Sequence, residues 1–335
     1  MACGVLVCGF LACATWLPAE EGASWLAPGR LTLGGRAGED VQEYVADALV
    51  PIWKPGRAIV FLNPRGTFLE DDEQELNVGL VARRLSWKQR VILGANAYYD
   101  TRWTESGNQF EQVGGGIEIL SRWVALRANY YYPLTDEKVE REIVEVTRTR
   151  SGSRRTATTT LFRTYEEALE GYDAEIGVWV PYLSRHVPTA LYVGWYDFSS
   201  DVESYDTDGL KVRLESRLHP NLTLDAEWFD DKELNRSEYF VGLRLRLPLD
   251  FWRGLKLERG GESSGSGGPA LDARMSDMVY RDFRIRTRQT GRIAVSQDML
   301  ETTVDRPDDA PPPKNCYQYA DLDSDGNVVI ITVCE

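Results

Sequence analysis

Few residues in this chain have the type and spacing that catalysis requires. The two histidines, His186 and His219, both lie in short polar segments between predicted strands. Nucleophilic catalysis by serine needs a histidine within hydrogen-bond reach of the hydroxyl and next to the substrate. Solvated turn histidines are the simpler interpretation. We therefore expect no enzymatic activity and no cofactor.

An acidic segment near the C-terminus matches the first half of a calcium-binding loop. Asp321, Asp323 and Asp325 alternate with other residues and are followed by Gly326, as in the pattern D-x-D-x-D-G. The twelfth position would be Thr332 instead of a bidentate glutamate, and no helical pattern flanks the segment. A turn between two strands is favoured, with weak calcium binding as the alternative. No other metal site is expected.

The first residues have the pattern of an export signal. Residues 2–17 are apolar and too short to span a membrane as a helix, and Ala12-Cys13-Ala14 resembles a cleavage site. The stretch contains no lysine or arginine, so a buried N-terminal segment is the alternative. We expect a signal peptide over residues 1–24.

The cysteines indicate one disulfide bond. Three of the five, at positions 3, 8 and 13, lie within the expected signal peptide. Its cleavage would leave Cys316 and Cys334. An even pair in an exported chain is typical of a disulfide that closes a small loop. Two unrelated thiols are the alternative.

Composition excludes several classes of function. The 335 residues include 38 Lys and Arg against 52 Asp and Glu, which gives a formal net charge of −14. Nucleic-acid binding needs a basic face, so no nucleic-acid partner is expected. No run of about 18 apolar residues follows the N-terminus, which argues against membrane-spanning helices. Hydropathy leaves a β-barrel open, because barrel strands are apolar on one face only.

Alternation with period two dominates residues 30–249 and predicts β-strands. In residues 76–83, for example, aliphatic side chains fall on one face, and Asn77 and Arg83 on the other. Strands of about ten residues with one aliphatic and one charged face match membrane-crossing strands around a polar lumen. About twelve strands are expected, near residues 30–37, 43–52, 57–66, 75–85, 89–100, 109–120, 122–132, 170–181, 189–197, 208–217, 221–229 and 237–248. Residues 41–49 fit a helix equally well.

The connections favour the same architecture. Short turns alternate with longer polar links, as in outer-membrane barrels, whereas a soluble sandwich has no reason to alternate in this way. The longest link, residues 133–169, is rich in Thr, Arg and Ser and is expected to be a surface loop. The Gly114-Gly115-Gly116 run lies inside a predicted strand, which favours a close-packed lumen wall or a bulge over a nucleotide-binding loop.

The sequence changes character after Leu249. Residues 251–315 contain Gly/Ser-rich, arginine-rich and proline-rich stretches and are expected to form a flexible linker. Residues 316–335 combine two short apolar runs with a turn pattern at 323–327, which predicts a small hairpin or a truncated passenger.

Residues 93–100 (LGANAYYD) and several later segments resemble, in order, the inverse autotransporter β-domain, the translocator of intimin and invasin. The motif residues that carry this resemblance include Gly94, Asn96, Tyr99, Asp100, Asn129 and Asp173. The resemblance implies an all-β fold, a transmembrane antiparallel β-barrel of about twelve strands over residues 25–250. It also implies that Gly242, Leu245 and Leu247 form the terminal-strand signal read by the outer-membrane insertion machinery.

The same resemblance implies an outer-membrane translocator or anchor that displays its C-terminal segment at the cell surface, as adhesins do. About 85 residues follow the barrel, so a much reduced passenger is expected. The implied partners are outer-membrane lipid, the insertion machinery, periplasmic chaperones and a possible cell-surface ligand.

Two other interpretations remain open. One is a stand-alone barrel, a pore or structural protein with a periplasmic tail; the other is a soluble carbohydrate-binding protein. If the chain is a translocator, its arginine-rich stretch is expected to enter the lumen. There it would pair with Asp173, Glu175, Asp225 and Glu227.

Overall fold

The computed structural model describes residues 29–38, 42–69, 73–86, 88, 90–151, 154–181, 183, 187–200, 206–231, 236–248, 271–303, 316–322 and 328–334. The chain divides into two compact units. We call Met1–Thr135 with Leu169–Ile285 the barrel unit, and Asp136–Ala168 with Arg286–Glu335 the hairpin–tail unit. The expected signal peptide, residues 1–24, lies outside the described residues.

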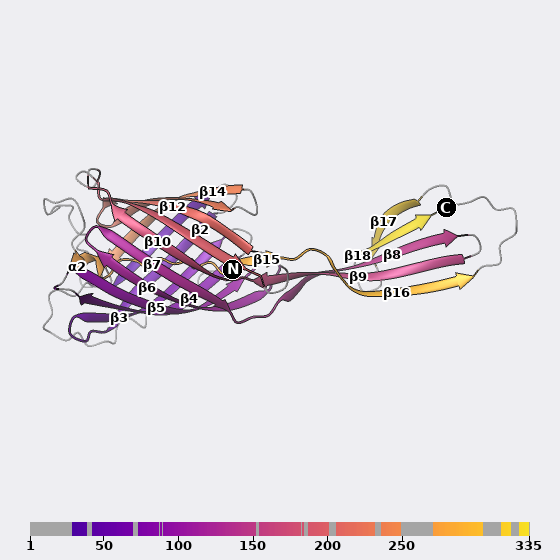
Figure 1. The fold of residues 1–335 in the computed structure, drawn as a ribbon, viewed down its shortest axis with the longest axis horizontal. Helices are drawn as coiled ribbons and strands as arrows, with labels where there is room; N and C mark the ends of the chain where they lie inside the picture. Colours follow the sequence, from indigo (N-terminus) through magenta and orange to yellow (C-terminus); the bar gives the residue numbers. More distant parts are fainter. Residues whose placement is uncertain are drawn as a thin grey trace, which may run out of the picture. The chain divides into compact units, whose positions relative to one another are not determined.

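Twelve antiparallel strands close the barrel unit into a ring (Figure 1). They are β1 (Arg30–Gly38), β2 (Gln42–Trp53), β3 (Ala58–Leu69), β4 (Gln74–Ser86), β5 (Val91–Trp103), β6 (Gln109–Ser121), β7 (Val124–Pro133), β10 (Glu170–Trp179), β11 (Thr189–Ser199), β12 (Asp206–His219), β13 (Leu222–Asp231) and β14 (Arg236–Pro248). β1 completes the ring because Arg30 lies opposite Leu49 of β2 on one side and Pro248 of β14 on the other. The predicted antiparallel barrel is confirmed, and residues 42–49 belong to a strand.

Side chains along each strand alternate between the outside and the inside of the barrel. In β5, Leu93 and Tyr99 are 46% and 44% exposed, whereas Ile92 and Asp100 are completely buried. Similarly exposed apolar side chains on other strands include Val78, Leu80, Ile117, Ile176, Val193 and Leu243. An apolar outer surface around buried charges is the reverse of a water-soluble domain and suits contact with lipid.

The two ends of the barrel carry different connections. We call the base the end where β1 begins, β14 ends and β6 turns into β7; the rim is the opposite end, where β7 leads into the next strand, β8. At the base, the Ser121 hydroxyl accepts the Val124 N–H at 3.0 Å and stabilises the β6–β7 turn. Gly56 in the β2–β3 turn has a φ of 57°, a conformation that glycine adopts without strain.

Residues 271–285, which we call the lumen segment, run through the barrel from base to rim. The segment begins with α2 (Leu271–Arg274) and continues as an extended chain. At the base, the Arg274 guanidinium donates to main-chain carbonyls of the β6–β7 turn. Near the rim end of β5, Arg102 donates to the carbonyl of Ile285. Among the described residues, no helix has the length and apolar character needed to cross a membrane.

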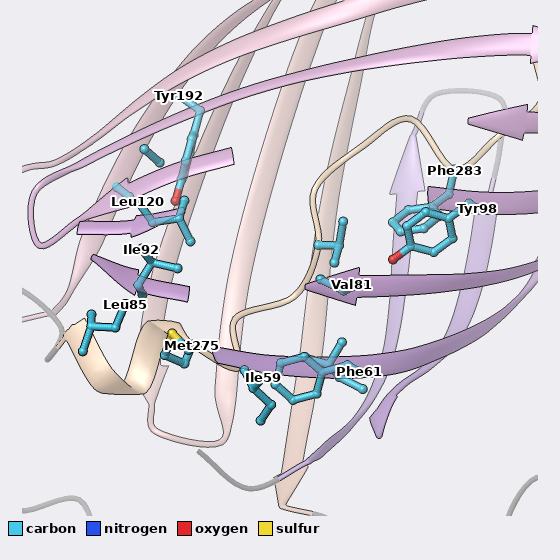
Figure 2. Packing of buried hydrophobic residues seen from close by; sticks show 14 of the residues in the cluster. Ile59, Phe61, Val81, Leu85, Ile92, Tyr98, Leu120, Tyr192, Met275 and Phe283 are labelled. Carbon is cyan, nitrogen blue, oxygen red and sulfur yellow. The ribbon is translucent and has the colours of Figure 1, made fainter. Parts of the chain in front are cut away.

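An apolar cluster packs around the lumen segment (Figure 2). Met275, Val279 and Phe283 of the segment are all buried. They join inward-facing apolar side chains of the wall, namely Leu49, Ile59, Phe61, Val81, Leu85, Ile92, Tyr98, Leu120, Ala125, Trp179, Ala190 and Tyr192. The segment is therefore packed as a core element and not as a loose linker.

The hairpin–tail unit is a six-stranded sheet (Figure 1). Its strands are β8 (Lys138–Ser151), β9 (Arg154–Ala168), β15 (Thr287–Gln289), β16 (Ile293–Thr303), β17 (Cys316–Leu322) and β18 (Val328–Cys334). β8 and β9 form one antiparallel hairpin, and β17 and β18 form another. β15 and β16 pair with β9, and β18 lies parallel to β8.

The expectation of a surface loop over residues 133–169 is wrong, because most of that segment forms β8 and β9. Its Thr, Val and Ile residues favour strands, but charged and polar residues on both faces conceal the period of two. Within the expected linker, residues 251–315, the described residues 271–303 contain the lumen segment, β15 and β16.

Candidate functional site

Three of the motif residues meet three consecutive residues of the lumen segment. Asp100 on β5 holds Arg281 through two hydrogen bonds, of 2.6 and 3.2 Å. Asn129 on β7 donates through Nδ2 to the carbonyl of Tyr280 at 3.3 Å. Asp173 on β10 accepts the N–H of Asp282 at 3.3 Å. We call Asp100, Asn129 and Asp173, with the residues they hold, the central contact site.

The central contact site is tied together by bonds among the wall residues themselves. Asn129 Nδ2 donates to Asp173 Oδ1 at 2.7 Å, and Tyr131 donates its hydroxyl to Asp173 Oδ2 at 2.6 Å. The Tyr131 oxygen also accepts the N–H of Asp282 at 2.7 Å. On the other side, Asn77 donates to Asp100 Oδ1 at 2.9 Å. These bonds fix the acceptor positions before the segment is bound.

Glycines of β6 leave the space that the central contact site occupies. A Cβ atom at Gly114 would lie 2.5 Å from Arg281 Nη2. One at Gly116 would lie 2.1 Å from Asn129 Oδ1. Gly115, on the outward face, would meet no atom closer than 3.7 Å. The glycine run thus belongs to a close-packed lumen wall, as its position in the predicted strand indicated.

A second group of contacts holds the segment near the base. The Asp277 carboxylate accepts from Arg217 at 2.9 Å and from Arg246 at 3.2 Å. Arg83, which is 1% exposed, donates to the main-chain carbonyls of Met275 and Asp277 at 3.0 and 2.5 Å. The Arg83 guanidinium is neutralised by Glu118, with Nε 2.5 Å from Oε1.

A third group holds the segment near the rim. Asn77 Nδ2 donates to the carbonyl of Phe283 at 3.1 Å. Glu73 pairs with Arg102 at 2.9 Å and with Arg284 at 3.6 Å. The Arg65 guanidinium lies over the Phe283 ring, 4.2 Å from its centroid. Contacts therefore follow the segment along the lumen instead of gathering at one point.

The ion pairs expected between the arginine-rich stretch and the wall are wrong in their partners. Glu175, Asp225 and Glu227 are neutralised by basic residues of the wall itself. The pairs are Glu175 with Arg127 and Arg213, Asp225 with Arg244, and Glu227 with Lys211. Asp173 does contact the segment, but through a main-chain N–H. Wall arginines on the same or neighbouring strands lie closer to these carboxylates than the segment does.

The other motif residues have different surroundings. Gly94 leaves room for Glu118, whose Oε1 would lie 2.4 Å from an added Cβ. Asn96 borders Gly116 on the lumen wall, and Tyr99 points outward. Sequence analysis missed Arg83, which grips the segment's backbone. Its place on the polar face of a predicted strand was visible, but its burial depends on barrel closure.

Residues expected to form the insertion signal lie on β14, where it pairs with β1. Leu245 lies opposite Leu33 and Leu247 opposite Leu31. Leu245 is 41% exposed on the outer face. A Cβ at Gly242 would lie 2.8 Å from the Cβ of Arg36. These residues thus lie at the seam where the last strand closes the barrel.

Candidates near the C-terminus fall partly outside the described residues. The β17–β18 register places Cys316 directly opposite Cys334. Asp321 belongs to β17, whereas Asp323 and Asp325 lie outside the described residues. In the part of the chain that the structure describes, no group of three or more His, Cys, Asp or Glu residues is arranged to hold a metal ion.

The histidines have no catalytic surroundings in the described part. His219 lies at the base, where its Nδ1 accepts the N–H of Asn221 at 3.2 Å. His186 lies outside the described residues.

The family model of the inverse autotransporter β-domain matches residues 20–282. The chain belongs to this family. The match ends within the lumen segment, so it covers the barrel strands and the central contact site. This inverse autotransporter barrel is an outer-membrane protein whose family consists of translocator barrels and not of enzymes, and its apolar outer face meets lipid.

Solved structures support the fold. One from a study of in-meso crystallization of membrane proteins has a TM-score of 0.57 at 14% identity, covering 78% of this chain and 100% of that one. An outer membrane channel from Pseudomonas putida F1 gives 0.43 at 10% identity, covering 69% and 98%. An outer membrane protein from Acinetobacter baumannii gives 0.36 at 9% identity, covering 67% and 100%. No curated protein sequence matches the chain.

Proposed function

We propose that the inverse autotransporter barrel displays the chain beyond Ile285 at the cell surface, with its base toward the periplasm and its rim outside. The observation that carries this proposal is the direction of the lumen segment. β14 ends at the base, the segment contacts the base turn through Arg274, and Ile285 lies near the rim. Residues that follow Ile285 therefore leave the barrel at the rim.

The proposed mechanism is passive and needs no catalytic residue. Lipid cannot satisfy open backbone groups, so a closed ring of strands is the stable inserted form. The wall then retains the segment through the Arg281–Asp100 ion pair and through bonds to its backbone. We infer that the barrel serves as an anchor, with an adhesin-like role for the displayed residues.

The packed lumen argues against the alternative of an open pore with a periplasmic tail. Met275, Val279 and Phe283 occupy the interior together with buried wall side chains. Arg83 and Asp100 are 1% and 0% exposed, so water has little access around the segment. A solute channel would need the segment to leave.

Entry into the membrane completes the proposal. Residues 1–24 would direct export, periplasmic chaperones would carry the unfolded chain, and the insertion machinery would read Gly242, Leu245 and Leu247 on β14. Their place at the β1–β14 seam supports this role, because pairing of the terminal strand is the step that closes the barrel.

Protease treatment of intact cells tests the display. One chain carries an epitope tag after Glu335; the matched control carries the same tag after Pro220, in the β12–β13 turn at the base. We expect the first tag to be lost without permeabilisation and the second to survive until the outer membrane is opened. Survival of the tag after Glu335 in intact cells would contradict display, and conductance measurements would then test the pore.

A further inference from the structure

The β8–β9 hairpin is bound along both of its edges by strands that follow the lumen segment. β15 and β16 lie antiparallel to β9. β18 lies parallel to β8, with Val329 opposite Val144 and Thr332 opposite Thr147. The hairpin belongs to the connection between β7 and β10, whereas the other strands belong to the C-terminal tail. The sheet is thus assembled from two distant parts of the chain.

Pairing with β9 begins almost as soon as the tail leaves the lumen. Two residues after Ile285, Thr287 lies opposite Ala168, the last residue of β9. The pairing then continues along the hairpin until Thr303 lies opposite Arg154, the first residue of β9. The tail thus pairs with β9 in sequence order, from the end of β9 that joins the barrel strands toward the hairpin's turn.

A pair of main-chain and side-chain bonds holds the first part of the tail. The Thr290 N–H donates to the carbonyl of Tyr165 at 2.8 Å. The Tyr165 N–H donates in turn to the Thr290 hydroxyl at 2.9 Å. Thr290 is 5% exposed, so this reciprocal contact is shielded from water. It bridges the interval between β15 and β16, where ladder pairing is interrupted.

Neither partner has the composition of a sheet that folds alone. Among the described side chains of β8 and β9, Ile143 is the only buried apolar one. Met299 and Leu300 of β16 are 67% and 70% exposed. An isolated two-stranded hairpin is marginal in water, and its edges present unpaired N–H and C=O groups to any available strand. Stability of the unit must therefore come mainly from strand pairing between hairpin and tail.

We propose that the β8–β9 hairpin is a docking template that captures the tail by strand addition as it emerges from the barrel. The proposal rests on the display proposed above and assigns the partner: a β-strand of the same chain, recognised through its backbone. Strand addition is a known mode of peptide recognition that draws its affinity from main-chain hydrogen bonds. The displayed module is then a joint product of barrel and tail, and capture opposes return of the tail into the lumen.

Disulfide trapping on intact cells tests the register. In a chain with Cys316→Ser and Cys334→Ser, the variant Thr158→Cys/Met299→Cys places cysteines at directly paired positions of β9 and β16. The control Thr156→Cys/Gln297→Cys uses the same strands four residues out of register, since Gln297 pairs with Thr160. Cα atoms farther apart than about 7 Å cannot be bridged without backbone movement. We expect the first pair, and not the second, to form a disulfide.

Shortening the hairpin tests capture with the native cysteines in place. Residues 138–168 are replaced by Gly-Ser-Gly-Ser, and a matched control receives the same replacement at residues 201–205, another rim connection. Heat-modified gel mobility confirms that each barrel has folded. Because cleavage follows the population of unpaired tail, protease cuts within residues 286–303 should be faster by about ten-fold or more in the first variant only.

The outcomes separate the two proposals. An accessible tag after Glu335 with no bridge in the Thr158→Cys/Met299→Cys variant, or with bridges in both variants, would overturn capture and leave display standing. Equal cleavage rates in the shortened and control variants would do the same. An inaccessible tag would overturn display, and capture outside the membrane with it.

Discussion

Replacing Arg281 with methionine is the most direct perturbation of the central contact site. The Arg281 and Asp100 side chains are 1% and 0% exposed, with Nη2 and Oδ2 2.6 Å apart. Removing one partner of a buried ion pair leaves an uncompensated charge, at a cost of about 3–5 kcal/mol. Asp100 keeps the hydrogen bond from Asn77. We therefore expect the lower end, about 3 kcal/mol, which is roughly a hundred-fold change in the folding equilibrium.

The matched control is Arg284→Met, a change of the same type three residues along the same segment. Arg284 is 33% exposed and lies 3.6 Å from Glu73. Exposed pairs of this kind contribute about 0–1 kcal/mol because water screens them. The assay is urea unfolding of the barrel in lipid vesicles, followed by tryptophan fluorescence. The double variant Arg281→Met/Asp100→Asn should recover part of the loss, because no unpaired charge then remains.

An equal, small loss for Arg281→Met and Arg284→Met would refute this reasoning. It would mean that water screens the central contact site as well as the rim. The lumen segment would then be a hydrated linker, and the bonds from Asn129 and Asp173 would have to be re-examined as transient contacts.

Three other changes test the lumen and the tail. Gly114→Ala should destabilise the barrel by about 1–3 kcal/mol and Gly115→Ala should not, because only the first Cβ overlaps Arg281; equal unfolding midpoints would contradict this packing. Replacing residues 271–285 by a Gly/Ser sequence of equal length should produce conductance in planar bilayers; none would mean that other residues close the lumen. Cys316 and Cys334 should resist alkylation until reduced, and Cys334→Ser should cost about 3 kcal/mol; labelling without reductant would exclude the bond.

The barrel strands could be predicted because one physical pattern governs them all. Each barrel strand has lipid on one side and the lumen on the other, so apolar and polar side chains must alternate, as Leu93 and Asp100 illustrate. β8 and β9 lack this constraint. Their described side chains are mostly half-buried or exposed on both faces, so composition resembles a loop, and strand formation depends on pairing with a tail more than a hundred residues away.

Ion-pair partners were harder to predict than strands. The notion of an arginine-rich segment among lumen carboxylates was correct in kind, since Arg281 pairs with Asp100. The choice of carboxylate depends on strand stagger around the closed ring and on competing wall arginines. Arg213, for example, reaches Glu175 at 2.8 Å from a neighbouring part of the wall. Neither distance can be read from spacing along one strand.

The wall holds the lumen segment largely by its backbone, and this bears on how a passage can also be an anchor. Arg83, Asn77 and Asn129 all donate to main-chain carbonyls of the segment. Every residue except proline presents the same carbonyl and N–H groups, so such contacts can form and break with any sequence in the lumen. Only side-chain partners such as Arg281 and Asp277 distinguish one register from another. Under the proposed display, a backbone-binding wall would let the chain move, and these two charged residues would define where it stops.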